Sequence, residues 1–128
     1  MKNGLEVNKY AAGRSFFSKA PDARVLIVRS TQAGERLFWV KDAQVSSKAV
    51  RESESSMKVS EITGVDTGSR ASSVLRSKAS ASDDDRVLSI QGGERTLDLR
   101  VADKRTAEWL SKGIKLLIAD HRGEIEEE

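Results

Sequence analysis

The chain has 128 residues, of which 38% are hydrophobic and 33% are charged, and its net charge is +2. This length and composition are typical of one globular domain with one core, so a fibrous or low-complexity chain is excluded. Because the chain has no cysteine, a disulfide framework, a thiolate zinc site and a thiol nucleophile are excluded as well.

No apolar run approaches the roughly 20 residues that a membrane span needs. The first residues also lack the apolar stretch of a signal peptide. We therefore expect a cytoplasmic protein, and any attachment to the cytosolic face of a membrane is expected to be peripheral.

The first residues of the chain show no sustained periodicity. We expect residues 1–12 to form a helical or frayed extension ahead of one domain that spans residues 13–122. Short runs rich in β-branched and aromatic residues then predict five strands in the first half of this domain. These strands are Ser15–Lys19, Arg24–Arg29, Arg36–Lys41, Met57–Val59 and Glu61–Thr67.

Two stretches rich in serine and charge interrupt this series. Asp42–Ser56 and Ser69–Asp85 lack periodicity and are predicted to be long loops, the second with a turn of helix at Ser73–Ser77.

The second half contains a predicted hairpin. Arg86–Gln91 and Arg95–Val101 are rich in β-branched and aliphatic residues, and in the second run Leu97, Leu99 and Val101 alternate with polar residues. The two runs are joined by Gly92-Gly93-Glu94, and a Gly-Gly pair supplies the positive φ that tight hairpin turns require.

A helix is predicted to follow over Asp103–Arg122. Its apolar residues recur at helical spacing, and Asp103 is a suitable N-cap. The acidic residues 123–128 are expected to be a solvated tail. Seven short strands and one helix predict a mainly β sandwich or barrel that the helix closes at one end.

Several of these segments together resemble the pleckstrin homology domain, most of all the type at the N-terminus of phospholipase C-delta. The resemblance covers residues 13–119 and rests on Glu61–Gly68, Asp85–Ile90, Thr96–Leu99 and the helix that carries Trp109. It implies a seven-stranded β-sandwich or barrel capped by one C-terminal helix. Both the helix pattern and the resemblance predict that Trp109 packs in the core and binds no ligand.

The resemblance also implies a binding site for anionic phospholipid headgroups. In the family this site lies at the end of the first strand, the start of the second strand and the turn after the third, which here hold Lys19, Arg24 and Lys41. Lysine and arginine suit phosphate because they are charged donors. Further candidates are Lys48 and Arg51 in the following loop, and Thr96, which can equally be an ordinary β-branched strand residue.

The loop after Lys19 departs from the pattern of family members that bind polyphosphoinositides. Only four residues separate Lys19 from Arg24, and one of them is Asp22. The sparse cluster favours phosphatidic acid, and some similarity to acylated pleckstrin homology domains points the same way. The alternative is a protein–protein docking platform with little lipid affinity.

No set of residues predicts catalysis. His121 is the one histidine, and the consecutive carboxylates of Asp83–Asp85 lack the alternate spacing of a calcium loop. Gly92-Gly93 leads into a strand, so it is no phosphate-binding loop. We expect no enzyme, no metal and no cofactor, and no nucleic-acid partner because no stacking aromatics accompany the basic residues.

Overall fold

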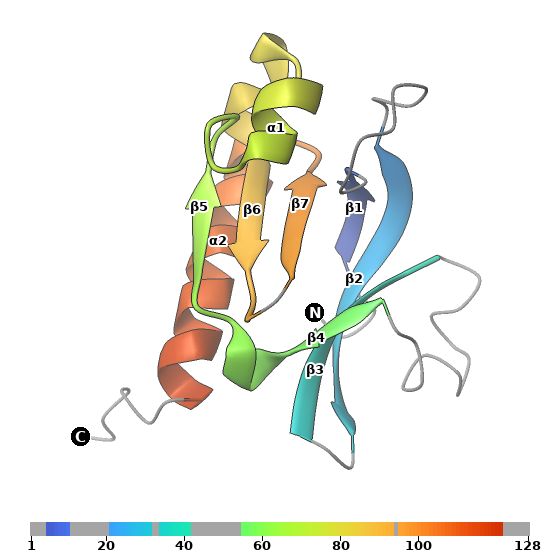
Figure 1. Cartoon of the computed structure of the whole chain (residues 1–128), viewed down its shortest axis with the longest axis vertical. Helices are drawn as coiled ribbons and strands as arrows, with labels where there is room; N and C mark the ends of the chain where they lie inside the picture. Colours follow the sequence, from blue (N-terminus) through green and yellow to red (C-terminus); the bar gives the residue numbers. More distant parts are fainter. Residues whose placement is uncertain (1–4, 11–20, 32–33, 42–54, 94, 122–128) are drawn as a thin grey trace.

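The computed structural model describes residues 5–10, 21–31, 34–41, 55–93 and 95–121. Within these ranges seven strands form one antiparallel sheet in the order β4-β3-β2-β1-β7-β6-β5 (Figure 1). The strands are β1 (Leu5–Lys9), β2 (Asp22–Thr31), β3 (Gly34–Val40), β4 (Ser56–Lys58), β5 (Gly64–Thr67), β6 (Val87–Gln91) and β7 (Thr96–Arg100). The helices are α1 (Ser73–Lys78) and α2 (Lys104–His121), with short 3-10 turns η3 (Val59–Glu61) and η4 (Ala81–Arg86). The predicted mainly β fold with a C-terminal helix is confirmed.

The largest difference from the sequence-based prediction lies at the N-terminus. Leu5–Lys9 forms β1, which pairs with β2 on one side and β7 on the other, so the predicted extension is wrong for these residues. The segment alternates apolar and polar residues, and Val7 is buried. The predicted strand Ser15–Lys19 lies outside the described residues.

The predicted strands from β2 to β5 are confirmed with shifted bounds. β2 begins at Asp22, and β5 begins only at Gly64 because η3 occupies Val59–Glu61. The β2–β3 hairpin brings Thr31 opposite Gly34, whose φ of 108° requires glycine there.

The β6–β7 hairpin is confirmed, but for a different reason from the one expected. Gly92 and Gly93 do not have positive φ. Glycine suits position 92 because a Cβ there would lie 3.1 Å from the Met57 sulfur and 3.1 Å from the Arg95 carbonyl oxygen, so these neighbours would have to shift by a few tenths of an ångström. Close packing against β4 therefore favours a small residue here.

The two α-helices cover opposite faces of the half-sheet β5–β7. Leu75 of α1 packs against Tyr10 and Val87, whereas α2 packs in the main core with Leu88 and Ile90. Val87 and Leu88 are successive strand residues, so their side chains point to opposite faces. Figure 1 accordingly shows α1 in front of β6 and α2 behind it.

Helix α2 has the predicted bounds to within one residue at each end, and the predicted N-cap is confirmed. Asp103 Oδ1 accepts a hydrogen bond of 2.8 Å from the backbone nitrogen of Thr106.

None of the helices in the described part of the chain combines the length and the apolar character that crossing a membrane requires.

The predicted core position of Trp109 is wrong. The side chain of Trp109 is 54% exposed, while Leu110 is buried. Successive helix residues are about 100° apart, and the face that packs on the sheet holds Ala107, Leu110 and Ile114. Trp109 therefore points to the outer side of α2.

The predicted loop Ser69–Asp85 is more ordered than expected, since it contains α1 and η4. Its buried Asp83 accepts hydrogen bonds from Arg86 Nη2 at 2.6 Å and from Arg100 Nη1 at 3.3 Å. The hydrogen bond from Arg86 lowers the pKa of Asp83, against the effect of its burial. Asp84 accepts from the Ser69 hydroxyl at 2.6 Å. These carboxylates thus have structural partners, and the described residues contain no cluster suited to a metal ion.

Candidate anion-binding site

A cavity of about 410 Å³ opens where β1, β3, β7 and the start of α1 meet. Its lining combines cations, hydroxyls and one indole: Lys9, Trp39, Ser72, Ser73, Val74, Arg95, Thr96 and Asp98. Ser72, which is the N-cap of α1, and the first two residues of this helix, Ser73 and Val74, bring the start of α1 to the cavity.

Lys9 is the last residue of β1 and is half-buried at the cavity wall. Its ammonium donates a hydrogen bond of 3.4 Å to the carbonyl oxygen of Tyr10. Burial lowers the pKa of Lys9, and the positive charge of Arg24 lowers it further. Asp98 opposes this shift, and Arg95 adds to it.

Arg24 of β2 lies on the same sheet face as Lys9. It pairs with Val7, and directly paired antiparallel residues share a face, as do residues two apart in one strand. Arg24 Nη1 donates a hydrogen bond of 2.7 Å to the carbonyl oxygen of Ala23. Arg24 is partly buried, and its positive charge lowers the pKa of Lys9.

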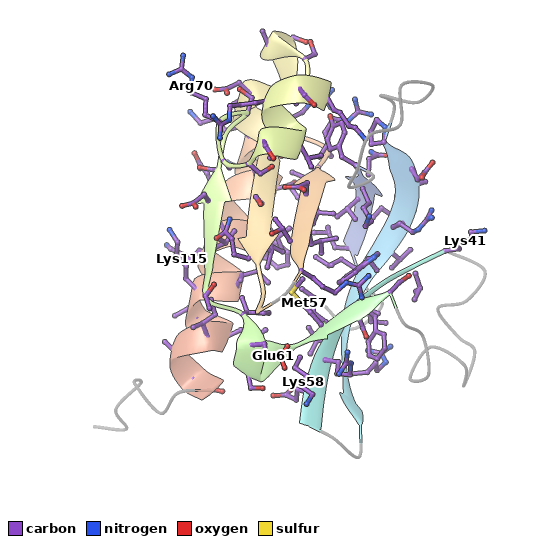
Figure 2. All side chains as sticks on the ribbon, in the orientation of Figure 1. Lys41, Met57, Lys58, Glu61, Arg70 and Lys115 are labelled. Carbon is purple, nitrogen blue, oxygen red and sulfur yellow. The ribbon has the colours of Figure 1, made fainter. Side chains whose placement is uncertain are left out.

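Lys41 follows Val40, which pairs with Val25, so Lys41 lies across from Arg24 at the end of β3. Its side chain is exposed and points away from the strand end (Figure 2). Lys41 therefore marks the outer edge of the basic group formed by Lys9 and Arg24.

Arg95 is the second cation that lines the cavity. Its guanidinium carbon lies 5.0 Å from the centroid of the Trp39 ring, and Nη1 donates a 3.0 Å hydrogen bond to the carbonyl oxygen of Ser56. Stacking of a guanidinium on an indole is attractive and orders the side chain. Arg95 is therefore held at the cavity wall by β3 and β4.

The polar residues of the cavity have two roles. Asp98 is buried and accepts a 2.6 Å hydrogen bond from the Ser72 hydroxyl, which itself caps α1 by accepting from the Leu75 backbone nitrogen at 3.1 Å. Thr96 is exposed at the cavity rim. Asp98 thus fixes the wall of the cavity, and Thr96 lies at its rim.

Arg24, Lys41 and Thr96 are the sequence-predicted site residues that lie within the described chain. The structure brings Arg24 and Thr96 close to Lys9. Lys19, Lys48 and Arg51 lie outside the described residues. Sequence reasoning missed Lys9 and Arg95. The alternation of Leu5, Val7 and Lys9 could have indicated a strand that ends in a cation.

The expected short connection before Arg24 does not apply to the observed strands. Because β1 ends at Lys9 and β2 begins at Asp22, the connection comprises residues 10–21. The four residues were counted from Lys19, which lies outside the described residues. Counted between β1 and β2, the connection is longer, so loop length no longer argues against polyphosphoinositides.

The comparisons with known proteins concern the fold. No family model matches the sequence, and no curated protein matches it. In structure, the chain is similar to the PH domain of human oxysterol binding protein-related protein 11, with a TM-score of 0.61 and 12% identity over 96% of this chain and 84% of that one. It is also similar to PLC21 of S. officinalis, with a TM-score of 0.60 and 14% identity over 91% of this chain and 15% of that one. The chain thus spans only a small part of PLC21. Strand order, helix position and these two likenesses lead to one conclusion, that the chain has the pleckstrin homology fold.

Proposed function

We propose that this domain binds anionic phospholipid headgroups and recruits its protein to the cytosolic face of a membrane. The observation that carries the proposal is that Lys9 and Arg95 line one cavity while Arg24, on the neighbouring strand β2, acts electrostatically on Lys9. Burial lowers the pKa of Lys9 most, and the positive charges of Arg24 and Arg95 lower it further.

Cations held close together in a partly buried place repel one another, and this arrangement costs stability. A bound phosphate offsets the repulsion and accepts charge-assisted hydrogen bonds from all three groups. Arginine can bind two phosphate oxygens at once, while lysine supplies a point charge. The cluster is therefore suited to an anion.

Phosphatidic acid is the lipid that we favour over polyphosphoinositides. Asp22 and Asp98 both act on Lys9 against its cationic neighbours, so the positive surplus around it is small. A single phosphomonoester needs fewer donors than several phosphates on one ring. This preference rests on charge count and no longer on loop length.

The test is co-sedimentation of the full chain with vesicles that differ only in phosphatidic acid, phosphatidylserine or a polyphosphoinositide, at low and at high salt. We expect binding that weakens with salt and is strongest for phosphatidic acid. Each cation near an anionic surface contributes about 1 kcal/mol, so Lys9→Ala with Arg24→Ala should weaken binding by roughly 30-fold.

The matched control is Arg70→Ala with Arg76→Ala, which removes the same charge from exposed positions that do not line the cavity. Figure 2 shows Arg70 on the opposite side of the view from Lys41. Equal loss in both double variants, or no binding to any vesicle at low salt, would contradict the proposal.

A further inference from the structure

The outer face of α2 carries an apolar stripe that the fold leaves uncovered. Among the described residues, Trp109 and Leu116 are the large apolar side chains that remain exposed, at 54% and 56%. They are seven positions apart, so they lie on one line of the helix, two turns from each other. Gly113 lies between them, and a Cβ built there would have no neighbour within 4 Å. The stripe is therefore open along its length.

Beside this stripe lies a cavity of about 370 Å³ between α2 and the end of β5. It is lined by Thr67, Glu108, Ser111, Lys112, Lys115 and Leu116. The side chains of Trp109 and Leu116 form a ridge next to this cavity. A ridge beside a cavity of this size can accept an apolar side chain of a partner.

The charged residues along the stripe are mostly cations. Arg105 and Lys112 alternate with Trp109 and Leu116 on the same line of the helix, and Lys115 stands at the edge of the cavity. These three cations form no ion pair with another described residue, whereas Glu108 is 4.0 Å from the ammonium of Lys104. The surface thus offers apolar contact together with unsatisfied positive charge.

This face points away from the anion-binding cavity. The start of α1 lines that cavity, and α1 and α2 cover opposite faces of the half-sheet β5–β7 (Figure 1). A membrane that engages Lys9 and Arg95 would leave Trp109 on the far side of the domain, where a second molecule can reach it.

We propose that the outer face of α2 docks an acidic amphipathic helix of a partner protein. Its apolar side chains pack on Trp109 and Leu116 and fill the adjoining cavity, and its carboxylates pair with Arg105, Lys112 and Lys115. A second copy of this chain does not fit, because a symmetric contact between two α2 helices would bring these cations face to face.

The test uses a synthetic helix-forming peptide with leucines at i, i+4, i+7 and i+11 and glutamates on the flanking positions. Two comparison peptides are a scrambled sequence of the same composition and a version with lysine in place of glutamate. Fluorescence anisotropy of labelled peptide is measured against the full chain. We expect the ordered acidic peptide to bind at least about tenfold more tightly than either comparison peptide.

Two variants locate the contact. Trp109→Ala with Leu116→Ala removes the apolar ridge, and Lys112→Glu with Lys115→Glu reverses the charge; each should weaken peptide binding by at least about tenfold. All four side chains are exposed, so the fold should persist, and circular dichroism checks this. Lys9→Ala with Arg24→Ala is the control and should leave peptide binding unchanged, which separates this inference from the proposed lipid site.

Equal binding of ordered and scrambled peptides, or unchanged binding by the Trp109 and Leu116 variant, would overturn the inference. So would loss of vesicle binding by that variant with peptide binding intact, because the face would then contact lipid rather than protein.

Discussion

At the scale of single residues, Lys9 is the clearest case of a side chain whose placement opposes stability. It is half-buried and lies near two arginines, and these surroundings disfavour its charged form. A lysine kept in such a place is typical of a group selected for binding rather than for folding.

We therefore predict that Lys9→Met leaves the free energy of unfolding unchanged or raises it, while it weakens binding to phosphatidic acid vesicles. The lowered pKa means that, between this pKa and the usual value of 10.5, the unfolded chain binds more protons than the folded one. Stability from this group consequently rises as pH increases through that window, and the rise should be absent in the variant.

Urea unfolding across neutral and alkaline pH measures this effect. Lys112→Met serves as the control, because Lys112 is an exposed lysine on α2. A loss of more than about 1 kcal/mol in Lys9→Met would show that the ammonium stabilises the fold.

At the scale of elements, helix α2 has apolar residues on two different faces, although they are adjacent in the sequence. Trp109 and Leu110 are neighbours in the chain, but Leu110 faces the sheet and Trp109 faces outward. The core-facing line carries the packing energy of this helix.

We predict that Leu110→Ala lowers the free energy of unfolding by about 2–5 kcal/mol because it leaves a cavity in the main core. Trp109→Ala should cost less than about 1 kcal/mol, because its side chain is mostly outside the core. Urea unfolding measures the free energy of unfolding of both variants. A larger loss in Trp109→Ala than in Leu110→Ala would show that Trp109 packs in the core.

At the scale of the whole molecule, β1 joins the two halves of the sheet. It pairs with β2 through Leu5–Lys9 and with β7 through Asn8 and Lys9. No other strand of the described sheet connects β2 with β7.

We predict that a chain beginning at residue 13, the start expected from the sequence, does not unfold cooperatively, whereas a chain beginning at residue 5 does. Without β1, both β2 and β7 would present unpaired edges, and Val7 would be missing from the core. Near-ultraviolet circular dichroism and thermal unfolding compare the two chains. Equal thermal unfolding midpoints for the two chains would support the predicted domain boundary at residue 13.

The sequence predicted the second half of the fold well and the first half less well. The β6–β7 hairpin was predictable because the alternating residues of β7 and the two glycines of the turn agree locally. Helix α2 was predictable because its apolar spacing agrees with the capping Asp103. β1 was missed because five residues with Glu6 and Asn8 give a weak signal, and its partners lie far along the chain. Arg24 and Thr96 were predictable from the resemblance, whereas Arg95 is held at the cavity by Trp39 and Ser56, which lie far from it in the sequence.

The pairing of Lys9 with Leu99 also bears on how the chain acquires its fold during synthesis. Of the described strands, β1 leaves the ribosome before the other six, and it cannot pair with β7 until nearly the whole domain has been made. Contacts between such distant segments slow folding, since a long loop must close before they form. The nascent chain consequently exposes an unpaired strand edge for most of its elongation, which makes this stage the one most open to aggregation or to chaperone capture.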